Sequence, residues 1–268
     1  MVKKAVIPAA GYGTRNLPIT KVLPKEMFPV AGRPAIDYIV REAVEAGIEE
    51  ILIIISRSKN MVMDYFDRSL ELEMFLSQAE KSHLIPLLET PKVHIQFIRQ
   101  SYAKGLGDAV CLAERFAGNE PFAVLLPDLL FINETANALQ KTIAVYNEYK
   151  ESVIGVKAVK EEDLKLYGVI KGTELAEGLY DITDIIEKPQ TSPPSNLAVM
   201  GRYVFTPEIF PFLNETLPGI GNEIQLTDAI KKMLTKYEAK AQVLEMDCFD
   251  LGKNEEYMTL LNYMFKKK

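Results

Sequence analysis

Cysteine is scarce in this chain of 268 residues, and its scarcity excludes two kinds of stabilising centre. The two cysteines, Cys111 and Cys248, do not form a Cys-x-x-Cys pair. A structural zinc site or a disulfide framework would need several suitably spaced cysteines. The sequence therefore indicates a reducing compartment, the cytoplasm. A chain of this length can bury a substantial core without cross-links.

Long apolar runs and an excess of positive charge are also absent. No apolar segment approaches the roughly 18 residues that a membrane-spanning helix requires, and the first predicted strand begins too early to leave room for a signal peptide. The formal net charge of −6 disfavours a nucleic-acid partner, because phosphate backbones favour a basic surface. The lysines at 266–268 indicate a solvated helix end. We therefore expect neither a membrane nor a nucleic acid among the partners.

The first half of the chain alternates between strand and helix patterns. Hydrophobic residues make up 48% of the chain and charged residues 25%, which is typical of a globular enzyme and excludes disorder. The patterns predict strands at 5–8, 51–55, 93–99, 122–126 and 153–159, and helices from 34 to the Gly47 stop and at 60–81, 106–117 and 135–149. Continuous aliphatic runs such as 51–55 suit strands that are buried on both faces of a parallel sheet. We expect a doubly wound α/β arrangement, with ligands outside the carboxyl ends of the strands.

The second half changes character, with short strands between clusters of Gly, Pro and Ser. The patterns predict strands at 167–171, 180–187, 198–205 and 241–246, and helices at 206–215, 225–236 and 255–265. We interpret the chain as a single domain, 1–268. Its nucleotide-binding half spans about 1–160, and a smaller sugar-binding lobe with C-terminal helices spans about 161–268. The expected fold class is α/β, with a doubly wound, Rossmann-like mixed sheet.

The segment 9–15 (AAGYGTR) leaves the first predicted strand and is the strongest local signal. A glycine-punctuated loop lets backbone N–H groups approach a polyphosphate closely. Arg15 can add a planar guanidinium and Lys25 a point charge. No Gly-Lys-Ser/Thr ends the loop, and Asn16 stands where a dinucleotide-binding loop has its third glycine. The loop indicates a nucleotide site of another kind, with a plain strand-to-helix turn as the alternative for the loop alone.

Two aspartates are candidate magnesium ligands. Asp128 follows the predicted strand at 122–126, where a carboxylate faces the ligand crevice, although an aspartate here could instead cap the next helix. Mg²⁺ needs few protein carboxylates, because phosphates and water complete its shell. Asp250 is the second candidate. The two histidines, His83 and His94, lie far from these motifs and are interpreted as structural.

Other polar residues near strand ends suggest sugar and base contacts. Glu187 could accept from sugar hydroxyls while Lys188 neutralises a sugar phosphate, although such a pair alone is more often a solvated turn. Gln100 and Gly105 could contact a base edge through an amide and a backbone group.

Taken together, these segments resemble the bacterial UTP–glucose-1-phosphate uridylyltransferases, the sugar nucleotidyltransferases that make UDP-glucose. The matching segments cover nearly the whole chain: 9–15, 24–27, 34–36, 105–110, 121–126, 187–189, 195–198, 201–203 and 223–228. Any one of them is weak, but their order and spacing are specific.

The resemblance implies a role for each candidate residue. The implied catalytic residues are Arg15, Lys25 and Lys188. The implied nucleotide-binding residues are Ala10, Gly11, Gly13, Thr14, Glu26, Gln100 and Gly105, of which the last three would read the uracil with help from the backbone of Ala10 and Gly11. The implied sugar-phosphate contacts are Gly168, Glu187, Lys188 and Gly201, and the implied magnesium ligands are Asp128 and Asp250. Glu26 is informative, because the related thymidylyltransferases usually have Gln there.

The resemblance also implies the reaction, in which UMP passes from UTP to glucose 1-phosphate with Mg²⁺ as the cofactor. UTP and glucose 1-phosphate are then the small-molecule partners, and a homodimer or homotetramer is expected. Two alternatives stay open. One is a transferase that uses another nucleotide, as in thymidylyl transfer, or another sugar phosphate. The other is a catalytically silent sugar-nucleotide sensor.

Overall fold

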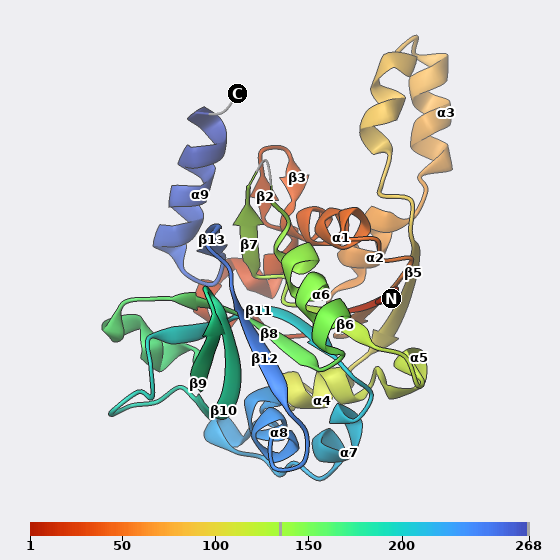
Figure 1. Cartoon of the computed structure of the whole chain (residues 1–268). Helices are drawn as coiled ribbons and strands as arrows, with labels where there is room; N and C mark the ends of the chain where they lie inside the picture. Colours follow the sequence, from red (N-terminus) through yellow and green to blue (C-terminus); the bar gives the residue numbers. More distant parts are fainter. Residues whose placement is uncertain (134–135, 267–268) are drawn as a thin grey trace.

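The computed structural model describes residues 1–133 and 136–266, and a nine-stranded mixed sheet runs through these residues (Figure 1). Its strand order is β5-β4-β1-β6-β11-β8-β12-β10-β9. The strands are β1 (Lys4–Ala9), β4 (Glu50–Ile55), β5 (His94–Arg99), β6 (Phe122–Leu125), β8 (Ser152–Ala158), β9 (Gly168–Ala176), β10 (Leu179–Glu187), β11 (Leu197–Phe205) and β12 (Ala239–Val243). The α/β mixed sheet expected from the sequence is confirmed.

The strand pairing joins the two halves of the chain in one sheet. β5, β4, β1 and β6 are parallel, as the aliphatic runs indicated. β11 then inserts antiparallel between β6 and β8, although β8 belongs to the first predicted half and β11 to the second. β12 is parallel to β8, and β10 and β9 complete the sheet as antiparallel neighbours. The division near residue 160 stays a prediction.

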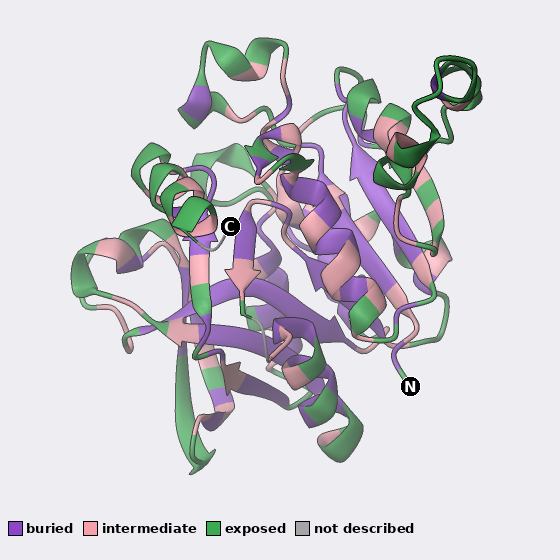
Figure 2. Ribbon diagram, turned by 90° about the horizontal axis from the view of Figure 1, so that it is seen from above, coloured by how far each residue is buried: buried purple, intermediate pink, exposed green. Residues whose placement is uncertain are grey.

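Helices cover both faces of the sheet and bury it. On one face lie α1 (Ala35–Glu45) and α6 (Ala138–Tyr149); on the other lie α4 (Leu106–Cys111), α7 (Ile209–Asn214) and α8 (Leu226–Met233) (Figure 1). Alternate residues of β4 divide between the two layers: Ile51, Ile53 and Ile55 pack with α1, whereas Leu52 and Ile54 pack with α4. Burial on both faces explains why β4 is aliphatic at every position from Ile51 to Ile55, and the central strands of the sheet are buried (Figure 2).

Several predicted elements differ from those observed. The helix expected at 60–81 is two helices, α2 (Asn60–Phe66) and α3 (Leu70–Gln78), because the backbone of Asp67 adopts an extended conformation between them. The helix expected at 106–117 is likewise α4 and α5 (Glu114–Ala117). The helix expected at 135–149 begins at Ala138, and its first predicted residue lies outside the described part of the chain. The C-terminal helix is α9 (Asn254–Lys266), and residues 267 and 268 also lie outside that part.

Two small antiparallel sheets and several 3₁₀ turns had no clear signal in the sequence. β7 (Leu129–Ile132) pairs with β13 (Asp247–Asp250), and β2 (Pro29–Val30) pairs with β3 (Arg33–Pro34). The 3₁₀ segments are η1 (Thr14–Asn16), η2 (Ile19–Lys21), η3 (Lys25–Met27), η4 (Ser82–Leu88), η5 (Glu161–Leu166) and η6 (Ile220–Asn222). The β7–β13 pairing brings the segment after Asp128 beside Asp250, which no local pattern predicts.

The segment formed by α3 and η4 extends away from the body of the molecule (Figure 1) and is mostly exposed (Figure 2). Its exposed apolar side chains are Leu70, Leu72, Met74, Phe75, Leu87 and Leu88. Within the described residues, no helix has both the length and the apolar character needed to cross a membrane.

Candidate active site

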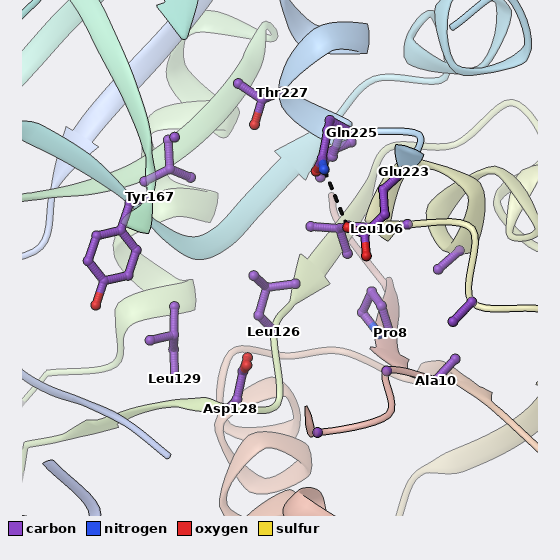
Figure 3. Close-up of a pocket in the computed structure, with 18 of the residues that line it drawn as sticks. Pro8, Ala10, Leu106, Leu126, Asp128, Leu129, Tyr167, Glu223, Gln225 and Thr227 are labelled. Atoms are coloured by element: carbon purple, nitrogen blue, oxygen red, sulfur yellow. Dashed lines mark hydrogen bonds between the residues drawn. The ribbon is translucent and has the colours of Figure 1, made fainter. Parts of the chain in front are cut away.

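A cavity of about 450 Å³ opens at the carboxyl ends of β1 and β6, where the sheet order places a ligand crevice (Figure 3). All of the predicted site residues except Gly201 line it: Ala10, Gly11, Gly13, Thr14, Arg15, Lys25, Glu26, Gln100, Gly105, Asp128, Gly168, Glu187, Lys188 and Asp250. In Figure 3, Ala10 and Asp128 lie on one side of the cavity, with Thr227 and Gln225 opposite and Tyr167 beside them. The structure thus brings together residues that lie up to 240 positions apart.

The glycine loop is held from two sides. Gly13 has φ 65°, a left-handed conformation that favours glycine, and its carbonyl accepts a hydrogen bond from the Thr20 hydroxyl at 2.8 Å. The Asn16 amide donates to Asn254 Oδ1 at 3.1 Å. The polar residue in place of a third glycine therefore ties the loop to the C-terminal segment.

Two cation–carboxylate pairs lie beside the loop. Lys25 Nζ is 2.5 Å from Asp128 Oδ2, and Arg15 Nη1 is 3.5 Å from Asp250 Oδ2. Burial alone would lower the pKa of Lys25, but the charges of Asp128 and Glu26 raise it above its ordinary value. Lys25 therefore stays protonated near neutral pH.

The two aspartates have different environments. Burial alone would raise the pKa of Asp128, but Lys25 holds it below its usual range. Burial raises the pKa of Asp250, and the neighbouring charge of Asp128 raises it further. Among the described residues, no group of three or more His, Cys, Asp or Glu side chains could hold a metal ion. Two neighbouring acids beside the glycine loop nevertheless fit Mg²⁺, because that ion needs only one or two protein carboxylates when phosphates supply other ligands.

Glu26 and Gln100, the predicted base-reading side chains, both have hydrogen-bond partners in the cavity wall. Glu26 is fully buried, and Lys59 Nζ donates to both of its carboxylate oxygens at 2.8 Å. The Gln100 amide donates to Asp108 Oδ2 at 2.6 Å. Lys59 was not among the predicted site residues. The signal was its position, because it follows β4 by four residues at the carboxyl edge of the sheet.

Gly105 lets a neighbouring segment approach closely. It has φ 112°, and a Cβ there would lie 2.5 Å from the carbonyl oxygen of Ile224. The Gly107 amide donates to that same oxygen at 2.8 Å. This contact brings Glu223, Gln225 and Thr227 into the cavity wall, although none of the three was among the predicted site residues.

We expect Gly105→Ala to destabilise the fold by at least about 2 kcal/mol and to raise the KM for the nucleotide, since both the backbone strain and the clash must be relieved. Gly118→Ala is the matched control, because Gly118 also has a positive φ (61°) but no atom near the added Cβ. Thermal unfolding and steady-state kinetics of both variants check the prediction. Equal destabilisation in the two variants would contradict the role of the Ile224 contact.

The sugar-phosphate candidates gather where β9 begins and β10 ends. The Thr227 hydroxyl donates to Glu187 Oε2 at 2.7 Å, and Lys188 Nζ lies 3.3 Å from Glu187 Oε1. A Cβ on Gly168 would lie 3.3 Å from that Oε2, so glycine keeps the space before Glu187 open. Gly201 instead lies behind Leu126, where an added Cβ would be 2.8 Å from the Leu126 side chain, and it does not line the cavity. Its contact with a sugar stays a prediction.

Comparison with known proteins agrees with this geometry. The model of the nucleotidyl transferase family matches residues 4–266. A Bacillus subtilis (strain 168) protein, provisionally named a UTP–glucose-1-phosphate uridylyltransferase, is 50% identical over 99% of this chain and 98% of its own length.

Two solved structures have the same fold. A UDP-glucose pyrophosphorylase complexed with UDP-glucose is 42% identical, with a TM-score of 0.90 over 100% of both chains. A UTP-bound UGPase from Acinetobacter baumannii is 38% identical, with a TM-score of 0.91 over 100% of this chain and 95% of its own. Because both the family model and these relatives extend over essentially the full length, the chain belongs to the nucleotidyl transferase family.

Proposed function

We propose that this chain transfers UMP from UTP to α-D-glucose 1-phosphate and releases UDP-glucose and pyrophosphate. The observation that carries the proposal is a single cavity with a glycine loop and two cations at one end and the Glu187–Lys188 pair at the other. Such a cavity can hold a nucleoside triphosphate and a sugar phosphate together. The names of the full-length relatives support UTP and glucose 1-phosphate as the two substrates.

The chemistry needs positioning and charge neutralisation more than proton transfer. An oxygen of the sugar phosphate attacks the α-phosphorus of UTP, and the bond from that phosphorus to the bridging oxygen of the β-phosphate breaks. The nucleophile is already an anion, so no general base and no covalent enzyme intermediate are required. Lys188 orients the sugar phosphate, and Arg15 and Lys25 stabilise the charge that develops on the phosphates. Positioning alone can supply roughly 7–11 kcal/mol in favourable cases.

We also propose Mg²⁺ as the cofactor, held by Asp128 and Asp250. When bound, the ion neutralises phosphate charge and makes pyrophosphate a better leaving group. Asp128 would be one of the two residues that hold the ion, and its hydrogen bond from Lys25 fixes the position of that lysine in the cavity wall.

Pyrophosphate release from UTP and glucose 1-phosphate in the presence of Mg²⁺ tests the function directly. A strong preference for dTTP in the same assay would favour thymidylyl transfer instead. No release at high protein concentration would favour a sensor. The sensor is disfavoured by the chain itself, because Arg15, Lys25 and Lys188 all line the cavity with Asp128 and Asp250.

Arg15→Ala is expected to lower kcat by about 10²-fold, since one preorganised donor to developing charge is typically worth that much. The thermal midpoint should stay within about 3 °C of the wild type, because the Arg15 side chain is 55% exposed and its ion pair is long. Arg115→Ala, an exposed change on α5, is the control. An Arg15→Ala protein with unchanged turnover would refute the role of Arg15.

We further propose a homodimer or homotetramer that works in the cytoplasm. The exposed apolar side chains on α3 and η4 support self-association, because an apolar surface that extends from a folded body suits an interface. Light scattering coupled to gel filtration tests the oligomer. A monomer at all concentrations would contradict it.

A further inference from the structure

Glu26 and Lys59 form a buried ion pair behind the cavity. Glu26 is fully covered, and the Lys59 side chain is 5% exposed. Glu26 lines the candidate active site, whereas Lys59 lines an adjoining cavity of about 440 Å³ on the other side of the glycine loop. Lys59 therefore reaches the carboxylate from outside the substrate cavity. It can influence a bound base only through Glu26.

Apolar residues in place of the pair could stabilise the fold at least as well. Two charges removed from water lose several kcal/mol of solvation each, and well-packed apolar side chains of similar volume are often as stabilising or more so. Burial lowers the pKa of Lys59 even though the charge of Glu26 acts in the opposite direction. A costly pair at the wall of a ligand cavity points to recognition.

The chemistry of the pair limits what Glu26 can recognise. Lys59 Nζ donates to both carboxylate oxygens of Glu26, and a carboxylate accepts hydrogen bonds but donates none. Uracil has a donor at its ring N3–H, whereas N3 of cytosine is an acceptor. Where the carboxylate faces N3 of the base, cytosine would place a buried acceptor against a buried acceptor, which is strongly unfavourable. Its N4 amino donor lies one position further along, where uracil has the O4 acceptor.

We propose that Lys59 is a positioning residue that keeps Glu26 an oriented, acceptor-only carboxylate and thereby selects UTP over CTP. The inference rests on the proposed function for the identity of the nucleotide, and it adds the residue that makes the base selection strict.

The test is the ratio of the CTP to UTP dissociation constants, measured by calorimetry for the wild type and for Lys59→Met, Lys59→Arg and Lys92→Met. Lys59→Met is expected to weaken UTP binding at least tenfold and to lower the CTP/UTP ratio at least tenfold. Lys59→Arg should keep most of the wild-type CTP/UTP ratio, because a guanidinium can also donate to both carboxylate oxygens of Glu26. Lys92→Met removes an exposed lysine outside both cavities and should change nothing.

Steady-state kinetics with glucose 1-phosphate give a second measurement. In Lys59→Met the KM for UTP should rise at least tenfold while kcat changes less than threefold, because Lys59 does not touch the reacting phosphates. A merely structural role would lower the thermal midpoint without changing the base ratio. A folded Lys59→Met protein whose CTP/UTP ratio lies within twofold of the wild type would overturn the proposal.

If Lys59→Met fails to fold, the double variant Glu26→Gln with Lys59→Met tests the proposal in its place. It removes both charges, so no unpaired ion stays buried, and its amide can donate as well as accept. The CTP/UTP ratio of dissociation constants of the double variant should also fall at least tenfold. An unchanged ratio would equally overturn the proposal. A wild type that selects UTP in calorimetry but releases no pyrophosphate would refute the proposed function alone. A wild type without base preference would refute this inference.

Discussion

Lys25→Met is expected to lower kcat/KM for UTP by about 10²–10³-fold, which is the typical loss when one preorganised group that stabilises transition-state charge is removed. Lys25 carries the charge nearest to Asp128, at 2.5 Å, and both side chains line the cavity. Its raised pKa keeps that charge in place at neutral pH. The measurement is pyrophosphate release as a function of UTP concentration, with thermal unfolding in parallel.

The matched control is Lys240→Met. Lys240 is also a buried lysine, with Nζ 2.5 Å from Glu151 and 2.7 Å from Asp181, but it lies outside the cavity. The control should lose stability and keep kcat/KM. A Lys25→Met protein that retains half of the wild-type kcat/KM while folded would exclude Lys25 from the catalytic machinery.

Arg202→Met is expected to lower the free energy of unfolding by about 3–5 kcal/mol, because removing one partner leaves the other charge buried and uncompensated. Arg202 is fully buried, and its guanidinium donates to both Glu42 oxygens at 2.8 and 2.7 Å. It also donates to the carbonyls of Leu126 and Leu129 at 3.2 and 2.9 Å. These residues flank Asp128, so the variant should also disturb the position of that proposed magnesium ligand. Urea unfolding measures the stability.

The double variant Arg202→Met with Glu42→Gln should recover part of the loss, since it removes the uncompensated charge. Arg68→Met breaks a bidentate pair with Glu73 at the surface and should change stability little. A loss below about 1 kcal/mol in Arg202→Met would show that the buried network is dispensable.

Local patterns predicted most of the fold and the residue types of the site. The aliphatic run of β4 is buried at every position from Ile51 to Ile55, because the strand lies between two helical layers. The break at Asp67 was missed, since α2 and α3 both have helical sequences and only the extended backbone between them separates the two. Local patterns also did not predict where Gly201 lies in the fold. Its left-handed φ of 63° lies at an irregularity in β11, behind Leu126.

The sequence by itself determined that this is an α/β protein with a glycine-punctuated loop after its first strand and with charged residues at strand ends. Those features depend on neighbours in the chain, such as alternating patterns and glycine spacing. The tertiary structure alone decided that β11 lies between β6 and β8, that β7 pairs with β13 beside the two aspartates, and that Lys59 holds Glu26. These are contacts between distant segments, which packing and electrostatics select once the sheet has formed.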